Sequence, residues 1–304
     1  LACHFRAQYF VLLALFATLF TLEKKWKPAA FTAIFALVNL ALIVPYGTTV
    51  KVAQAKQSHL RILSMNLDFR NSSYGEAVTL IAKTRPDLLI LMELSQKWES
   101  ELKETLATFP YSARFTYTIP SLPNWLFELV HSWAPNSTYS AESPVQKLSL
   151  GLFSQLPFEN VKTSQLDSYP VPHVKAQLKF RGKPFILLGA HLVSPASKAR
   201  ADIRNRQLSD LADIIKGLNQ PTVLLGDLNT TPWSPYFKDF IQMTGLLESR
   251  KGLGLYPTWP TWFSPLRIPI DHSLTSNGIT VQSFSLGRNI GSDHFPVILD
   301  FSVG

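Results

Sequence analysis

The sequence contains little cysteine and little charge. A single cysteine, Cys3, stands among 304 residues, which excludes an internal disulfide framework and a structural zinc site made of cysteines. Charged residues make up 16% of the chain, below the roughly 25% that is usual for soluble domains. Either the folded core is therefore large or part of the chain lies in lipid. Internal repeats and low-complexity tracts do not stand out either.

The distribution of charge favours lipid for the N-terminal segment. Before Ser58 there is one acidic residue, Glu23, and there are six basic ones: Arg6, Lys24, Lys25, Lys27, Lys51 and Lys56. Most of the formal net charge of +8 therefore belongs to this apolar segment. The basic balance of the whole chain does not by itself indicate a surface that binds nucleic acid.

Two uncharged stretches, residues 7–22 and 28–50, flank a lysine-rich turn. We predict a transmembrane helical hairpin over residues 1–50. The second stretch reaches the roughly 20 residues needed to span a bilayer core, whereas the first is shorter and relies on flanking basic side chains that snorkel. The alternative is a signal peptide followed by a buried helix, but no small-residue cleavage pattern is present.

The lysines of the turn determine the expected orientation. The positive-inside rule places them in the cytoplasm, so the chain after Val44 emerges on the outer face. The sequence thus predicts a protein of the cell inner membrane with an extracytoplasmic, periplasmic domain. Residues 51–59 are polar and read as a linker to that domain.

From residue 60 onward, apolar strands alternate with amphipathic helices. The predicted helices cover about 74–84, 96–108 and 200–218, and the predicted strands are 60–65, 87–92, 148–153, 173–180, 185–190, 222–226, 270–275, 279–286 and 296–301. Because few helices separate the later strands, a doubly wound parallel sheet fits poorly. We expect an α/β fold in which two mixed sheets pack together and are flanked by helices.

Polar side chains end or interrupt these apolar strands. They are Asn66, Glu93, His191, Asp227, Asn229, Asp271, His272, Asp293 and His294. Carboxylates and imidazoles are costly to bury unless they pair or bind a metal. Each alone has a structural explanation, such as a turn residue at Asn66, a core histidine at His191 or an Asx turn after Asp227. Their joint occurrence indicates a functional site.

The segments GDLN (226–229), IDH (270–272) and SDHFPV (292–297) occur in an informative order. With this spacing the chain resembles the endonuclease/exonuclease/phosphatase superfamily, the exonuclease III and deoxyribonuclease I-like fold, over residues 60–304. The segments GLGLYPTWP (252–260) and RNRQL (204–208), together with the hydrophobic helices, resemble its bacterial membrane-anchored branch. The resemblance implies a four-layer α/β sandwich with the site at one edge of the two sheets.

The resemblance also implies a divalent metal cofactor, usually Mg²⁺, with Mn²⁺ as a substitute. At the matching positions, Glu93 supplies a hard carboxylate ligand, Asn66 lies beside it and Asp293 shares the ion. Mg²⁺ prefers a few carboxylate ligands and several waters over a full protein cage.

The catalytic roles are carried over in the same way. Asp227 orients and deprotonates the attacking water, and Asn229 positions the phosphate or that water through its amide. His191 and His294 donate hydrogen bonds to the phosphoryl oxygens. Asp271 holds His294 in the required tautomer.

Two arginines are further candidates for contact with the substrate phosphate, Arg204 on the predicted helix 200–218 and Arg288 before the last motif. For Arg204 the alternative is a solvated position on the helix face. His272 is expected to point away from its neighbour Asp271, because adjacent strand residues face opposite sides of a sheet.

Residues 112–147 read as an insertion in the 60–304 domain. Its segment 125–133 is aromatic and amphipathic. One interpretation is a lid over the site or a segment at the membrane interface, where tryptophan is favoured. A surface helix packed on the sandwich is the alternative.

The sequence therefore predicts a membrane-anchored, divalent-metal-dependent phosphoester hydrolase of the phosphodiesterase or nuclease type. Its partners would be a phosphoester substrate, either nucleic acid or a phospholipid head group, and the membrane, with no obligate protein partner evident. The alternatives are a lipid or inositol phosphate phosphatase or phosphodiesterase of the same fold, and an inactive membrane-tethered binding domain.

Overall fold

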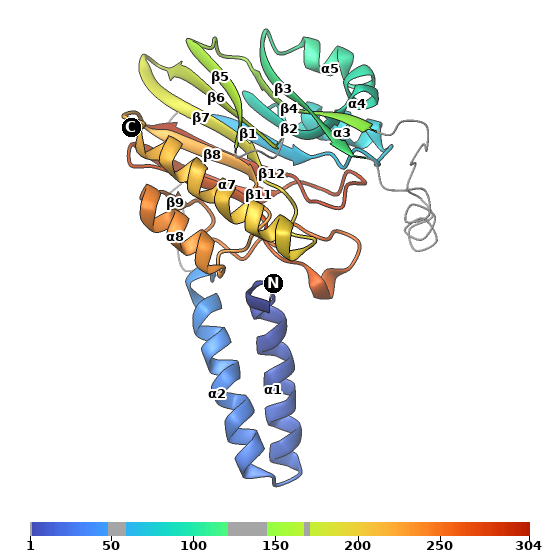
Figure 1. Ribbon diagram of the computed structural model, residues 1–304, viewed down its shortest axis with the longest axis vertical. Coiled ribbons are helices and arrows are strands. Elements are labelled where there is room, and N and C mark those ends of the chain that lie inside the picture. Colours follow the sequence, from blue (N-terminus) through green and yellow to red (C-terminus); the bar gives the residue numbers. More distant parts are fainter. Residues whose placement is uncertain (1, 48–58, 121–144, 167–170) are drawn as a thin grey trace.

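A computed structural model describes residues 2–47, 59–120, 145–166 and 171–304. A pair of N-terminal helices projects from an α/β domain that begins at Leu60 (Figure 1). The site described below lies in the α/β domain. The two helices are relevant to the predicted attachment of that domain to a membrane.

Helix α1 (Arg6–Leu22) and helix α2 (Trp26–Ile43) lie side by side as a hairpin (Figure 1). In the described part of the chain, one helical run, Trp26–Tyr46, is long and apolar enough to cross a membrane, and α1 is shorter. A signal sequence near an N-terminus meets the same criteria, so length and composition do not distinguish the two. Residues 48–50 of the predicted second span and 51–58 of the predicted linker lie outside the described residues.

The domain contains two six-stranded sheets. The first has the order β11-β12-β1-β2-β4-β3 and the second β5-β6-β7-β8-β10-β9. Their bounds are β1 Leu60–Asn66, β2 Leu88–Ser95, β3 Tyr111–Pro120, β4 Val145–Ser154, β5 Asn160–Leu166, β6 Val171–Phe180, β7 Lys183–His191, β8 Thr222–Asp227, β9 Leu247–Glu248, β10 Asp271–Thr275, β11 Ile279–Leu286 and β12 Val297–Val303. The pairs β1–β2 and β7–β8 are parallel and the others antiparallel. The prediction of two mixed sheets is confirmed.

Burial on both faces explains the apolar runs. In β1, Ile62 packs into the core between the sheets, and Leu63 packs on the opposite face against helices. Leu187 and Leu188 of β7 divide in the same way. Side chains alternate across a strand, so a strand covered on both sides needs apolar residues at every position.

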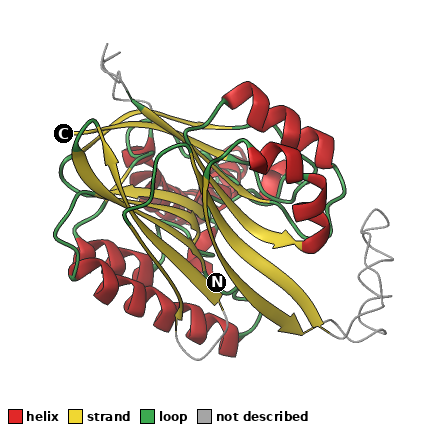
Figure 2. Cartoon of the chain, turned by 90° about the horizontal axis from the view of Figure 1, so that it is seen from above, coloured by secondary structure: helices red, strands yellow, loops and turns green. Residues whose placement is uncertain are grey.

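Helices cover the two outer faces, which gives four layers (Figure 2). The first sheet carries α3, α4 and α5, and the second carries α7 and α8. Their bounds are α3 Tyr74–Thr84, α4 Gln96–Glu101, α5 Lys103–Ala107, α7 Lys198–Lys216 and α8 Pro235–Thr244. The predicted helix 96–108 is thus two short helices. Helix α8 and strands β5 and β9 were not predicted.

The predicted insertion 112–147 is wrong at both ends. Strand β3 pairs with β4 along its whole length, from Tyr111 opposite Ser154 to Pro120 opposite Val145. Residues 112–120 and 145–147 therefore belong to the first sheet. β3 is its edge strand, and its alternating, partly solvated pattern lacks the continuous apolar run that marks the central strands. The aromatic segment 125–133 lies outside the described residues.

Gly226 provides a test of the close pairing between β7 and β8. Its φ is +148°, and a Cβ there would overlap the carbonyl oxygen of Ala190. We expect Gly226→Ala to lower the unfolding temperature of the full chain in detergent by several degrees, since strained or overlapping substitutions cost about 1–3 kcal/mol. The control is Gly75→Ala in α3, where no atom lies within 4 Å of the added Cβ. Equal unfolding temperatures for the two variants would contradict this account.

Candidate active site

The strand register brings the predicted side chains to one edge of the sandwich. His191 of β7 lies opposite Asp227 of β8, and Asp227 lies opposite Asp271 of β10. In the other sheet, Asn66 ends β1 beside β2, which carries Glu93. The carboxyl ends of two parallel strand pairs therefore supply most of the site.

A β-bulge directs Glu93 into this site. Leu91 pairs with Gly151 and Leu94 with Ser149, so β2 contains one residue more than β4 across this interval. Glu93 itself has a φ of +55°. Asp68 and Asn229 also have positive φ, +50° and +49°. A left-handed backbone is strained for glutamate, whereas aspartate and asparagine adopt it more readily, and such conformations cluster at functional sites.

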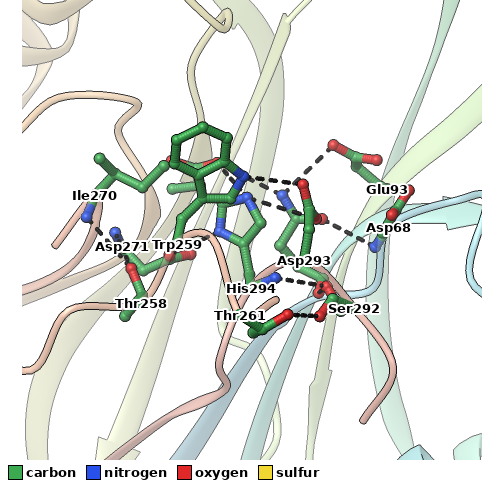
Figure 3. A network of polar contacts seen from close by, with 12 residues as sticks. Asp68, Glu93, Thr258, Trp259, Thr261, Ile270, Asp271, Ser292, Asp293 and His294 are labelled. Carbon is green, nitrogen blue, oxygen red and sulfur yellow. Dashed lines mark hydrogen bonds and ion pairs between the residues drawn. The ribbon is translucent and has the colours of Figure 1, made fainter. Parts of the chain in front are cut away.

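Asn66 lies between carboxylates of the two sheets, since its amide nitrogen is also 3.5 Å from Asp227 Oδ2. Its amide nitrogen lies 3.4 Å from Glu93 Oε1, and its amide oxygen accepts a hydrogen bond from the backbone N–H of Asp68 at 3.1 Å. Asp68, Glu93 and Asp293 lie close together (Figure 3). Burial and the charges of Asp68 and Asp293 raise the pKa of Glu93 to about 7.

These carboxylates supply hard oxygen donors of the kind that divalent cations prefer, although the described residues whose possible ligand atoms lie within 4.8 Å of one another are Asp227, Asp271 and His294. Arg70 offsets part of the negative charge, since its Nε lies 2.7 Å from Asp68 Oδ1 and its Nη2 lies 3.8 Å from Asp293 Oδ2. Three carboxylates against one guanidinium still leave an excess of negative charge on hard oxygen ligands, the donors that Mg²⁺ and Mn²⁺ prefer. Asp68 was missed from the sequence, although it stands two residues after Asn66 at the same strand end.

His294 and Asp271 form a buried pair. His294 Nδ1 lies 2.8 Å from Asp271 Oδ2, and His294 Nε2 lies 3.7 Å from Asp227 Oδ2. Burial lowers the pKa of His294, but the charges of Asp271 and Asp227 outweigh it and hold the pKa well above its usual range. Oxygen and nitrogen atoms of Asp227, Asp271 and His294 lie within 4.8 Å of one another and could also hold a metal ion. Because the Nδ1 contact already joins His294 to Asp271, a charged hydrogen-bonded pair suits this arrangement better.

Asn229 is committed to its neighbours. Its backbone N–H donates to Asp227 Oδ1 at 2.8 Å, and its side-chain nitrogen donates to Asp227 Oδ2 at 3.1 Å and to the carbonyl oxygen of Leu192 at 2.8 Å. The side-chain N–H groups of Asn229 therefore orient Asp227, whereas the sequence had predicted that this amide positions the phosphate or the attacking water. Burial and the nearby Asp271 raise the pKa of Asp227 well above its ordinary value.

His191 lies between the two acidic groups. Its Nε2 is 3.8 Å from Asp227 Oδ2 and 3.9 Å from Glu93 Oε1, and its Nδ1 is 3.4 Å from the hydroxyl of Tyr117. Burial and the charge of His294 lower the pKa of His191 to about 4, so it is neutral at pH 7. Tyr117 belongs to β3 and was missed because that strand had been assigned to an insertion.

The two candidate arginines do not join these residues. Arg204 is 4% exposed, so it is not a solvated side chain. It donates to the carbonyl oxygen of Asn229 and, at 2.9 Å, to Asn205 Oδ1, which supports the chain just after Asp227. Arg288 forms an ion pair of 2.8 Å with Glu76 of α3. The sequence had predicted that both arginines contact the substrate phosphate, but in these positions their guanidinium groups bind other protein groups.

His272 faces away from Asp271, as expected. Its Nδ1 lies 2.7 Å from Arg250 Nη2 and its Nε2 lies 2.8 Å from the carbonyl oxygen of Thr230. Around Asp293, Trp259 Nε1 donates to Oδ2 at 2.9 Å (Figure 3). Thr261 donates its backbone N–H to the carbonyl oxygen of Asp293 at 2.9 Å. The segment 258–261 thus forms a wall of the site.

A sequence model of the endonuclease/exonuclease/phosphatase family matches residues 63–294, which include all of these acidic and imidazole side chains. The chain belongs to this family. Members of the family are hydrolases that act on phosphoester bonds. No protein with a curated description matches the sequence.

Solved structures show the same fold. A D. rerio TDP2 structure with a single-stranded DNA product is 17% identical, covers 81% of this chain and 100% of its own, and has a TM-score of 0.61. The human Nocturnin catalytic domain with bound sulfate is 19% identical over 81% of this chain and 95% of its own, at 0.60. A Bacteroides thetaiotaomicron mannosyl-6-phosphatase is 16% identical over 80% and 99%, at 0.54.

The raised pKa of Glu93 predicts a dependence of stability on pH. In the unfolded chain this carboxyl titrates near 4.5, and in the folded chain at about 7. Between these values the folded state retains a proton that the unfolded state has lost, so the contribution of Glu93 to the free energy of unfolding falls as pH rises from about 4.5 to 7. The full fall is about 3 kcal/mol.

Glu93→Gln removes this contribution. The difference in unfolding temperature between the variant and the wild-type chain, both in chelator, should therefore grow in favour of the variant across this pH interval. Added Mg²⁺ should raise the unfolding temperature of the wild-type chain at pH 7.5 more than that of the variant. Parallel pH profiles in chelator would contradict the assigned environment of Glu93.

Proposed function

We propose that this protein is a divalent-metal-dependent phosphoester hydrolase that uses an activated water. The observation that carries the proposal is the row formed by His191, Asp227 and Asp271, with His294 held against Asp271 and the carboxylates of Asp68, Glu93 and Asp293 beside it. This arrangement combines a base of raised pKa, a protonated imidazole and ligands for a cation. Phosphoester hydrolysis needs these three components.

In the proposed reaction, Asp227 accepts a proton from water as the water oxygen forms a bond to phosphorus. The bond between phosphorus and the ester oxygen breaks, the leaving alkoxide takes a proton from solvent water to give the alcohol, and Asp227 then releases its proton to solvent. Asn229 holds Asp227 in position through its backbone and side-chain N–H groups. Asp68, Glu93 and Asp293 would hold a divalent cation, which would neutralise charge on the phosphoryl oxygens.

The two histidines have different protonation states and therefore different roles. His294 is the cation, and its Nε2 faces Asp227 and Asp293, at 3.7 and 3.9 Å, where it can donate to a phosphoryl oxygen. His191 is neutral at pH 7 and can donate one hydrogen bond without adding charge. Tyr117 orients the His191 ring through Nδ1.

We also propose that the hairpin anchors the protein in the inner membrane with the catalytic domain outside the cytoplasm. The exposed apolar side chains of both helices, such as Leu15 and Leu37, support a lipid environment. Glu23 and Lys25 lie at the turn that joins α1 to α2, and the positive-inside rule assigns that end to the cytoplasm. The resemblance to the membrane-anchored branch of the family points the same way.

Mutation of the proposed base tests the enzyme. The full chain in detergent micelles is assayed with single-stranded and plasmid DNA, RNA, phospholipids, inositol phosphates and simple mono- and diesters, with Mg²⁺, Mn²⁺ or chelator. Asp227→Asn should reduce kcat by at least about a thousandfold, because an amide cannot accept the proton from water. Asp213→Asn, an exposed carboxylate of α7, is the matched control and should keep full activity.

The same assay separates the alternatives. Cleavage that needs a divalent metal and is lost only in Asp227→Asn supports the hydrolase. Metal binding without cleavage of any ester would favour the inactive, membrane-tethered binding domain. Equal activity in Asp227→Asn and Asp213→Asn would overturn the assigned base.

Cysteine labelling tests the orientation of the anchor. With Cys3→Ser, the chain has no cysteine, so Lys24→Cys or Lys251→Cys introduces a single thiol. In intact spheroplasts an impermeant maleimide should label Lys251→Cys but not Lys24→Cys until the membrane is opened. The reverse pattern would place the domain in the cytoplasm, and labelling of both would show that the hairpin does not span the membrane.

A further inference from the structure

A loop beside the site exposes three large apolar side chains. Trp262, Phe263 and Leu266 are 73%, 43% and 44% exposed, and the rings of Trp262 and Phe263 stack with centroids 5.9 Å apart. Single exposed apolar residues are ordinary on a protein surface, but a cluster in five consecutive residues marks a surface that another apolar phase covers. We refer to residues 262–266 as the apolar loop.

Both ends of the apolar loop are held in place. Thr261 donates its hydroxyl to the carbonyl oxygen of Ser292 at 2.7 Å and its backbone N–H to the carbonyl oxygen of Asp293 at 2.9 Å. At the other end, Arg267 Nε donates to the carbonyl oxygen of Pro260 at 3.1 Å. The apolar side chains are thus presented from a fixed base that is bonded directly to the active site.

The hairpin is attached to this same edge of the domain. Gln8 of α1 donates to the carbonyl oxygen of Arg267 at 2.9 Å. His4 Nδ1 lies 2.8 Å from the hydroxyl of Thr231, and Trp233 donates to the carbonyl oxygen of Leu42 at 3.0 Å. The segment after β8, which carries Asn229, and the segment before β10, which carries Trp259, therefore contact both the site and the hairpin.

The apolar loop lies at the level where the apolar surface of the hairpin begins. Arg267 is beside Gln8, and the first strongly exposed apolar residue of α1 is Val11 at 61%. Three residues of helix correspond to about 4.5 Å along the axis. In Figure 1 the loop hangs from the domain beside the near end of α1, on the side from which the hairpin projects.

We propose that the apolar loop inserts into the interfacial region of a lipid bilayer and holds the catalytic edge against it. Tryptophan and phenylalanine favour that region, where their rings leave bulk water. The occupant is a bilayer because the apolar loop continues the apolar surface of the hairpin. A bilayer that covers the exposed apolar side chains of α1 begins at the level of the apolar loop. This part of the proposal rests on the proposed function: the substrate is then a phosphate ester carried by a membrane lipid. Cleavage of nucleic acid in place of lipid is the alternative outcome of the test below.

Fluorescence of a single label tests the contact. Full chains with Cys3→Ser and either Phe263→Cys or Tyr111→Cys are labelled with an environment-sensitive dye and reconstituted in phosphatidylcholine/phosphatidylglycerol vesicles, with and without lipids that carry a nitroxide just below the head group. Tyr111 is the control because it is exposed, at 38%, at the start of β3 in the first sheet. The lipid nitroxide should quench on the order of half the emission of the Phe263→Cys label, as expected for interfacial burial. The emission of the Tyr111→Cys label should change little.

Two results would overturn the contact. A Phe263→Cys label that stays as solvent-exposed as the control places the apolar loop in water. A label that is shielded but not quenched by the lipid nitroxide assigns the loop to a protein surface, either a second copy or another partner. Both readings are independent of catalysis.

A ratio of activities tests the substrate class. The double variant Trp262→Ala/Phe263→Ala should hydrolyse phosphatidylglycerol in vesicles about tenfold more slowly than the wild-type chain, because two interfacial aromatic side chains are removed, and should hydrolyse bis(4-nitrophenyl) phosphate at the wild-type rate. Tyr111→Ala should change neither rate. If the vesicle lipid is not cleaved while DNA is, the lipid substrate is wrong. If no ester is cleaved although the label is quenched, the proposed function fails and the bilayer contact stands.

Discussion

The structure depends on the burial of carboxylates at the ends of adjacent strands. Asp227 and Asp271 are 1% and 3% exposed and lie opposite each other in the β8–β10 pair. Their oxygens lie within 4.8 Å of each other, and two negative charges this close would repel strongly in a medium of low polarity, which together with burial raises the pKa of Asp227. The cationic His294 compensates for them, which requires the loop before β12 to return to β10.

The sandwich supplies the rigidity that such a cluster needs. Parallel pairing carries β7 and β8 to the same edge in register, so that His191 lies next to Asp227, and the absence of a Cβ at Gly226 allows β8 to approach Ala190. On the other sheet, the bulge at Glu93 turns a strand residue out of the regular alternation. The second sheet thus provides Asp227, Asp271 and the neutral His191, and the first sheet with its connecting loops provides His294 and the carboxylates of Asp68, Glu93 and Asp293.

Sequence reasoning succeeded where burial leaves a strong pattern. Central strands such as 87–92 are apolar at every position because both faces are covered, and they were found within a few residues. The edge strand β3 is half solvated and was mistaken for an insertion, which also hid Tyr117. Residue type and order identified Asp227 and His294, but spacing does not reveal side-chain direction. For that reason Arg204, which turns inward beneath Asn229, was misassigned.

The contacts between the hairpin and the domain limit how the site can face the membrane. Both helices take part, since His4 precedes α1 and Tyr46 follows α2, and Tyr46 donates a 2.7 Å hydrogen bond to Glu248. Glu248 pairs with the buried Arg250, which in turn contacts His272 next to Asp271. An attachment at two points restricts rotation far more than a single tether does. A hairpin fixed in lipid would therefore hold the catalytic edge at a constant height above the bilayer, within reach of head-group phosphates.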